Sequence, residues 1–176
     1  VVWRGPMLHG AITQFLRDTL WGDLDYLIID MPPGTGDIAL TLSQLLPLTG
    51  AVVVCTPQRV AQDDARRAVR MFQQLGIPVL GVVENMSFFI GDDGKEYDLF
   101  GKGGAKAMAA EMGLHFLGSM PIHMALRANS DAGTPLANWD HAALGAQLDT
   151  LCQQLAARVS TQAMSGHLVQ PTLSVR

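Results

Sequence analysis

The chain has few cysteines and no long hydrophobic run. Only Cys55 and Cys152 occur among its 176 residues, and two cysteines cannot build a disulfide framework. Cys55 lies inside an apolar run, where a thiol behaves as a small hydrophobic side chain. No stretch approaches the roughly 20 apolar residues of a transmembrane helix, and no basic-then-apolar leader opens the chain. We therefore expect a soluble protein of the reducing cytoplasm with no membrane partner.

Charged residues are also scarce and do not gather into a basic surface. They make up 16% of the chain and give a net charge of −4, whereas binding to nucleic acid needs clustered Lys and Arg. Only Arg66, Arg67 and Arg70 lie close together, at a spacing typical of the solvated face of an amphipathic helix. Nucleic-acid partners are therefore not expected. The 48% apolar content predicts one globular domain with a substantial core.

Three common catalytic or ligand-binding motifs are missing from the sequence. There is no Gly-x-x-x-x-Gly-Lys-Ser/Thr phosphate loop, no Gly-x-Ser-x-Gly nucleophile turn, and no metal-ligand spacing among the five histidines. The Gly-rich stretch 100–107 does not qualify as a phosphate loop, because Lys106 is followed by Ala107 and the stretch comes after a polar loop. We interpret it as a glycine-rich approach to a helix.

Apolar runs rich in β-branched residues alternate with helical patterns along the chain. This alternation predicts a three-layer α/β sandwich with a mostly parallel sheet, because each parallel crossover needs a long connection. We predict strands at 26–29, 51–55, 79–83 and 115–117, and helices at 8–20, 38–46, 60–75, 104–112 and 144–159. We expect residues 91–98 to form an exposed excursion, residues 1–160 to form the folded domain, and residues 161–176 to form a flexible tail.

The most informative stretch joins a predicted strand to a turn rich in Gly and Pro, from Asp25 to Asp37. Asp30 follows the apolar core of the strand, and ligands of open α/β sheets bind at that carboxyl edge. A carboxylate there can hold a Mg²⁺-bound water or orient an attacking water, while Gly34 and Gly36 let backbone N–H groups approach an anion. The stretch therefore indicates a nucleotide phosphate site. The alternative is that Asp30 and the glycines only end a strand and cap the next helix.

Two further loops are expected at the same edge of the sheet. Thr56 and Gln58 follow the second predicted strand and could contact a ligand, although Thr56-Pro57 also begins a helix well with nothing bound. Asn85 follows the third predicted strand, and its amide both donates and accepts hydrogen bonds, which suits the edge of a purine base. A turn-forming asparagine is the alternative, and the local sequence does not separate the two.

Six motifs occur in order along residues 1–136. They are Trp3 to Met7, Asp25 to Asp37, Thr56 to Gln58, Glu84 to Ser87, Phe100-Gly101 with Gly103-Gly104, and Gly118 with Pro121. Together they resemble the Mrp/ApbC family of ATP-binding iron–sulfur cluster carriers, within the MinD/ParA-like deviant P-loop class. The resemblance implies a partial P-loop NTPase fold. It also implies a homodimer that binds ATP with Mg²⁺, hydrolyses ATP slowly and delivers a labile cluster to recipient apoproteins.

The resemblance further implies roles for individual residues. Asp30 would be the catalytic acidic residue near Mg²⁺, contacting the ion through water. Asn85 and Pro121 would frame the adenine base. The switch that senses the γ-phosphate would consist of Pro32, Pro33, Gly34, Thr35, Gly36 and Asp37. Such a switch couples hydrolysis to shape, because phosphate and metal order its loop.

The chain departs from the family pattern in two places. The family's P-loop lies upstream of anything present here, and the chain opens at Val1 without an initiator Met. We therefore expect the C-terminal part of a longer protein, which binds ATP and Mg²⁺ only with that upstream region. The family's Cys-x-x-Cys is replaced by Gly91 and Gly94, and iron–sulfur clusters need thiolate ligands. A cluster is therefore not expected at the usual site.

Two other hypotheses remain open. The missing cysteine pair favours an ATP-gated interaction switch of the MinD/ParA kind, which positions a partner without carrying metal. The third hypothesis is that the chain on its own is a nucleotide-free structural fragment without enzymatic activity.

Overall fold

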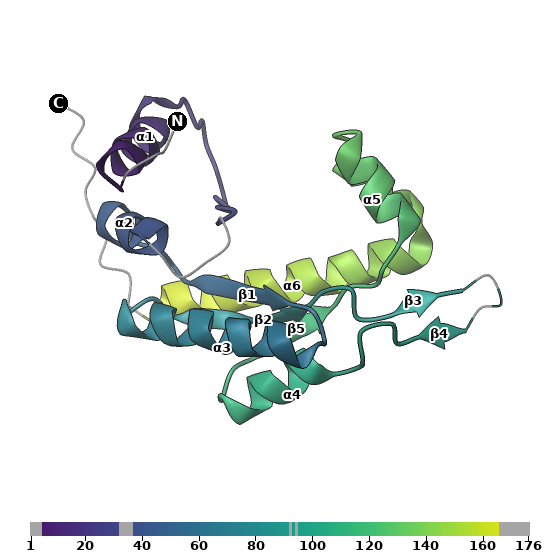
Figure 1. Ribbon diagram of the computed structural model, residues 1–176. Helices are drawn as coiled ribbons and strands as arrows, with labels where there is room; N and C mark the ends of the chain where they lie inside the picture. Colours follow the sequence, from purple (N-terminus) through teal and green to yellow (C-terminus); the bar gives the residue numbers. More distant parts are fainter. Residues whose placement is uncertain (1–4, 32–36, 92, 94, 166–176) are drawn as a thin grey trace.

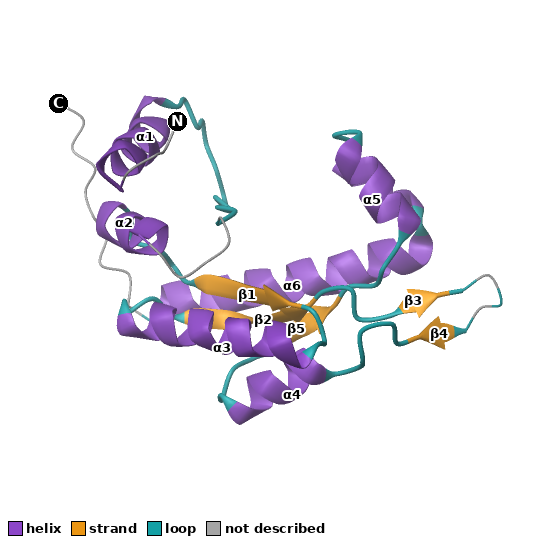
Figure 2. Ribbon diagram, in the orientation of Figure 1, coloured by secondary structure: helices purple, strands orange, loops and turns teal. Residues whose placement is uncertain are grey.

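The computed structural model of the protein describes residues 5–31, 37–91, 93 and 95–165. Its central parallel sheet consists of β1 (Ala51–Cys55), β2 (Val79–Glu84) and β5 (Phe116–Ser119), in the order β1-β2-β5. Helices cover both faces of this sheet (Figure 1), and the connections between strands are helical or looped (Figure 2). The predicted α/β class and three-layer architecture are confirmed.

Two helices, α3 (Arg59–Gln74) and α4 (Gly104–Glu111), cover one face of the sheet. Strand side chains alternate between the two faces, so every second apolar residue of β1 and β2 points into this layer. The helix α3 ends near its predicted position, because Gly76 takes a left-handed φ of 70° and Pro78 follows. The buried core between these helices and the sheet contains Val53, Cys55, Ala65, Val69, Val82, Ala105, Met108 and Ala109.

The long helix α6 (Ala142–Met164) covers the opposite face. Its predicted leucine stripe packs against the other set of strand side chains, with the cluster formed by Val52, Val83, Leu117, Met120, Leu126, Leu144, Leu148, Leu151 and Leu155. The helix continues to Met164, so helical structure extends past residue 160, where the folded domain was predicted to end. Within the described residues, every helix is too short or too polar to span a lipid bilayer.

The N-terminal helices α1 (Gly5–Asp18) and α2 (Asp37–Leu45) pack against each other near the beginning of β1 (Figure 1). Both helices match their predictions to within a few residues. Ala39 and Leu42 of α2 are buried, whereas Phe15 of α1 has 72% of its surface exposed. This pair of helices therefore has an apolar face that the described residues leave uncovered.

The segment between α1 and α2 corrects one prediction, because residues 26–29 do not form a strand. Tyr26, Leu27 and Ile28 are exposed, and the segment runs apart from the sheet (Figure 1). A strand needs a neighbour for its backbone N–H and C=O groups. Within the described residues the sheet ends at β1, which pairs only with β2, and residues 26–29 belong to neither sheet. The sequence pattern records apolar residues but not whether a partner strand is present.

Small elements that were not predicted complete the fold. The excursion predicted at 91–98 belongs to an antiparallel hairpin of β3 (Phe89–Ile90) and β4 (Glu96–Tyr97). Between β5 and α6 lie α5 (Met124–Asp131) and the 3-10 helix η1 (Pro135–Asp140). His123 begins α5, and its Nδ1 accepts a hydrogen bond from the backbone N–H of Ala125 at 3.2 Å.

Candidate functional site

The three parallel strands end at one level of the sheet. Cys55 of β1 is the register partner of Glu84 of β2, which in turn is the partner of Ser119 of β5. The loops that follow these residues therefore begin side by side at the carboxyl edge, where ligands of open α/β sheets bind. This confirms the expectation that Thr56, Gln58 and Asn85 share an edge.

Backbone hydrogen bonds join the loop that follows β2 to the end of β1 and to the loop that follows β5. The N–H of Asn85 donates to the carbonyl of Cys55 at 2.8 Å, and the N–H of Ser87 donates to the carbonyl of Met120 at 2.9 Å. Asn85 is half-buried, whereas Pro121 is buried. The structure thus brings Asn85 and Pro121 into adjoining loops, although only Asn85 offers a partly open side chain.

Asn85 sits in an unusual turn. Its Oδ1 accepts a hydrogen bond from the backbone N–H of Met86 at 3.0 Å, and Met86 has a left-handed φ of 53°. A residue with a Cβ rarely takes that conformation, and such residues gather at functional sites. Among the described residues the Nδ2 amide of Asn85 has no hydrogen-bond partner. The side chain therefore offers donors to a ligand while its oxygen holds the turn.

The loop after β1 is closed by its own side chains. The hydroxyl of Thr56 donates to Oε1 of Gln58 at 2.8 Å, and Nε2 of Gln62 donates to the carbonyl of Pro57 at 2.7 Å. Gln58 begins α3 without a side-chain cap hydrogen bond. This geometry is that of the start of a helix. The side chain of Gln58 is exposed, at the same edge of the sheet as Asn85.

A residue that sequence reasoning did not single out, Glu84, organises this edge. Only 1% of its surface is exposed, and its carboxylate accepts hydrogen bonds from the N–H groups of Gly103 at 3.2 Å and Ala105 at 2.8 Å. These N–H groups belong to the N-terminus of α4, so the carboxylate occupies the place that an external anion would take. This supports the interpretation of stretch 100–107 as an approach to a helix. The sequence signal that could have identified Glu84 is an acidic residue at the end of a predicted apolar strand.

Gly104 explains why the approach to α4 is rich in glycine. A Cβ at this position would collide with the amide of Gln62 and the carbonyl of Pro57. The start of α4 therefore lies directly against the loop that follows β1. Three motifs that are distant in sequence, at 56–58, 84–87 and 101–104, meet in one place.

The structure does not bring Asp30 to this edge through strand pairing. Asp30 is exposed, in a segment without regular structure. Asp37 begins α2, and its side chain is not described. The predicted switch residues Pro32, Pro33, Gly34, Thr35 and Gly36 lie outside the described residues. The roles of Asp30 and of this switch therefore stay predictions.

Neither cysteine belongs to a group of possible metal ligands in the described part of the chain, and no cluster of three or more His, Cys, Asp or Glu suited to a metal occurs there. Burial, and secondly the negative charge of Glu84, raise the pKa of the Cys55 thiol to about 11. Cys152 is exposed on α6. Because thiolates are the ligands of iron–sulfur clusters, Cys55 is poorly suited to be one.

Gly91 is one of the two positions at which the resemblance places the family's cysteines, and its neighbours in the hairpin are two exposed side chains. A Cβ there would lie 2.7 Å from the ring of Tyr97 and 2.9 Å from Oδ1 of Asp93. The Tyr97 hydroxyl donates to Oδ2 of Asp93 at 2.8 Å. Both side chains are exposed, so a larger residue at position 91 would displace side chains and not the backbone of the hairpin. Gly94 lies outside the described residues.

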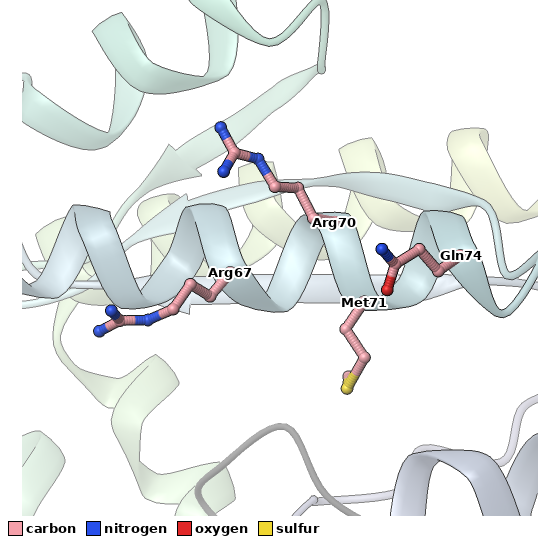
Figure 3. Close-up of a pocket in the computed structure, with 4 residues that line it drawn as sticks. All are labelled: Arg67, Arg70, Met71 and Gln74. Atoms are coloured by element: carbon pink, nitrogen blue, oxygen red, sulfur yellow. The ribbon is translucent and has the colours of Figure 1, made fainter.

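A shallow hollow lies on the surface of α3. Arg67, Arg70, Met71 and Gln74 line it, all from α3 (Figure 3). These residues lie in the C-terminal half of the helix, and α3 starts at the carboxyl edge of the sheet. The hollow is therefore remote from the loops described above, and Arg67 is paired with Asp64.

Comparison with known proteins relates the chain to one family. The family model described as "ParA: NUBPL iron-transfer P-loop NTPase" matches residues 1–159. Proteins named iron-sulfur cluster carrier protein are 50% identical in Synechocystis and 46% identical in Escherichia coli K12, over 93% and 100% of this chain. In both cases the match covers 47% of the relative, so the chain spans about half the length of these curated relatives.

A solved structure gives the same picture. The nucleotide-binding protein from Archaeoglobus fulgidus, in complex with ADP and with cobalt found in it, is 41% identical and superposes with a TM-score of 0.66. The match covers 73% of this chain and 54% of that protein. The sheet and its covering helices are therefore those of a nucleotide-binding fold.

Proposed function

Because this chain belongs to the ParA-type family of iron-transfer P-loop NTPases, we propose that it forms part of an ATP-binding protein of iron–sulfur cluster assembly in the cytoplasm. The observation that carries the proposal is the common level at which Cys55, Glu84 and Ser119 end their strands. That alignment supports a shared ligand edge at which the loops after β1, β2 and β5 act together.

The nucleotide would be held by residues of this chain and by an upstream phosphate loop. Asn85 and Pro121 would flank the adenine base, and the unpaired Nδ2 donors of Asn85 fit the ring-nitrogen acceptors of a purine. Asp30, whose carboxylate is exposed, would hold Mg²⁺ through water. Residues 32–37 would sense the γ-phosphate. When bound, Mg²⁺ neutralises charge on the phosphates, and ATP is hydrolysed slowly.

An iron–sulfur cluster would be the cargo of such a protein, and recipient apoproteins would be its partners. The residues of this chain do not fit the family's cluster site, because Gly91 supplies no thiolate. This observation favours a second candidate function, an ATP-gated MinD/ParA-like switch that positions a partner without carrying a cluster. In both cases the active form would be a homodimer.

The ATPase part of the proposal is tested on the protein that carries this chain together with its upstream region. We expect slow, Mg²⁺-dependent hydrolysis of ATP, and a loss of at least about tenfold in rate for Asp30→Asn. Asp23→Asn is the matched control, because Asp23 is an exposed carboxylate of the same segment. Equal rates for Asp30→Asn and Asp23→Asn would remove Asp30 from the proposed site.

Cluster carriage is tested separately by anaerobic reconstitution with iron and sulfide. Absorbance in the visible region together with bound iron would support the carrier. Their absence, with ATP hydrolysis intact, would support the switch. Cys152→Ala shows whether the exposed thiol on α6 contributes a ligand.

A further inference from the structure

Glu84 is a buried charge that the proposed ATPase does not use. Burying a carboxylate is unfavourable unless hydrogen bonds replace the lost water. Here three donors do so: the hydroxyl of Ser87 at 2.5 Å, the N–H of Gly103 at 3.2 Å and the N–H of Ala105 at 2.8 Å. These donors lie on two sides of the carboxylate, one in the loop after β2 and two at the start of α4.

The contact with α4 replaces the usual cap of a helix. Gly103 precedes α4 with a left-handed φ of 71°, and no side chain of the loop itself caps the helix. The carboxylate of Glu84 takes that role from the end of β2 and lies where the helix dipole favours negative charge. Because Glu84 is the last residue of its strand, its backbone is fixed by the sheet. The side chain of Glu84 therefore fixes the start of α4 relative to the sheet.

The contact with Ser87 closes the turn that contains Asn85. Within residues 84–87 the N–H of Asn85 is bound to the carbonyl of Cys55, and the N–H of Ser87 to the carbonyl of Met120. Between these anchors Met86 takes its left-handed conformation, which is unfavourable for a residue with a Cβ. The hydrogen bond from the Ser87 hydroxyl to Glu84 spans this turn and holds it closed.

From this geometry we infer that Glu84 is a positioning residue, which holds the 84–87 turn so that the Asn85 amide is presented to the base of the bound nucleotide. The inference rests on the proposed function, because it takes Asn85 as the residue at the base. In the closed turn, Oδ1 of Asn85 is occupied by the N–H of Met86, which leaves the Nδ2 donors for the ligand. If the turn opened, the Asn85 amide would lose its orientation, and Oδ1 would lose its hydrogen bond from Met86.

The test separates base recognition from phosphate recognition in the protein that includes the upstream region. Dissociation constants are measured for ATP and for inorganic triphosphate, which has no base, by competition with a fluorescent adenine nucleotide. The constant for triphosphate divided by the constant for ATP reports the contribution of the base, and this ratio falls when the contact with the base is weakened. We expect Asn85→Ala and Ser87→Ala to lower this ratio by roughly threefold to tenfold, the value of one hydrogen bond, with triphosphate affinity unchanged.

Glu84→Gln should also lower the ratio, because its amide has one acceptor oxygen in place of two and a nitrogen that only donates, so the three donors around the side chain can no longer all be satisfied. Ser130→Ala is the matched control: it removes a hydroxyl that bonds to the carbonyl of Leu126 within α5, away from the turn. If Glu84→Gln does not fold, Ser87→Ala decides the question, because it leaves the hydrogen bonds to α4 in place. Melting temperatures of all variants are recorded in parallel.

Each outcome has a defined meaning. If Asn85→Ala lowers the ratio while Ser87→Ala and Glu84→Gln leave it unchanged, the inference is wrong and the base contact of the proposed function stands. A lower melting temperature with an unchanged ratio would show that Glu84 is only structural, which also overturns the inference. If Asn85→Ala itself has no effect on the ratio, the proposed base contact fails, and the role of Glu84 fails with it.

Discussion

Cys55 and Glu84 stand opposite each other as register partners at the carboxyl ends of β1 and β2. Both are buried, and burial together with the charge of Glu84 raises the pKa of the Cys55 thiol from its ordinary value of 9.0 to about 11. The thiol is therefore neutral throughout the physiological range. Its titration in alkali reports on the integrity of this edge of the sheet.

We expect the free energy of unfolding to fall between pH 9 and about pH 11 because of this thiol. Below pH 9 the thiol is protonated in both states and has no effect. Above pH 9 the unfolded thiol loses its proton before the folded one does, which stabilises the unfolded state. Urea denaturation across this range measures the effect, and Cys55→Ala isolates it from other alkaline titrations. Identical pH dependence in the two proteins would show that the folded thiol has an ordinary pKa.

The exposed apolar segment between α1 and α2 should bind a hydrophobic dye. Leu20 is fully exposed and Ile28 has 74% of its surface exposed, so the chain presents an apolar surface larger than scattered single residues would give. We expect Ile28→Asp to reduce the fluorescence of bound ANS clearly without lowering the melting temperature. Leu136→Asp, at a residue 79% exposed in η1, is the control and should change the fluorescence less. A lower melting temperature for Ile28→Asp would mean that Ile28 is packed in the folded chain.

Substitution of Gly104 should destabilise the fold. The added methyl group of Gly104→Ala meets the carbonyl of Pro57 and the amide of Gln62, so α4 must shift away from the loop after β1. Overpacking of this kind costs about 1–3 kcal/mol. Gly10→Ala is the matched control, because Gly10 lies in α1 with no atom near its Cβ position. There the helix propensity of alanine should stabilise by about 0.5–1 kcal/mol.

Urea denaturation gives both free energies of unfolding. The contrast in sign between the two glycine substitutions is the decisive result. If Gly104→Ala stabilised the chain as Gly10→Ala does, the close contact between α4 and residues 57–62 would not exist in solution.

ATP with Mg²⁺ should leave the melting temperature of the 176-residue chain nearly unchanged. A ligand stabilises a protein only when its concentration approaches the dissociation constant, and this chain has no phosphate loop to provide affinity. Differential scanning fluorimetry at millimolar ATP measures the shift. The protein with its upstream region is the positive control. A rise of several degrees in the chain alone would show that it contains a phosphate cradle of its own.

Local sequence predicted the elements that are determined by their own apolar pattern and by nearby stop residues. The strand at 51–55 and the helices around 60–75 and 104–112 were found within one or two residues, because apolar period and stop residues such as Gly76 determine them. The strand predicted at 26–29 failed because a strand is defined by pairing. Its apolar composition is the same whether or not a partner strand is present.

The candidate site was predicted only in part for a related reason. The meeting of the loops after β1 and β2 follows from parallel topology, so Thr56 and Asn85 could be placed at one edge. The role of Glu84 could not, because its partners Gly103 and Ala105 lie 19 and 21 residues further along the chain. Hydrogen bonds over that distance leave no periodic trace in the sequence.

The position of β1 at the margin of the sheet has a consequence for handling the protein. Within the described residues one side of this strand is unpaired, and the side chain of Val54 has 58% of its surface exposed. Free backbone donors and acceptors beside an apolar side chain form a template for edge-to-edge aggregation. Concentrated solutions of the chain are therefore prone to aggregate. Val54→Lys should reduce this aggregation, because a charged side chain on an edge strand opposes pairing with a second copy.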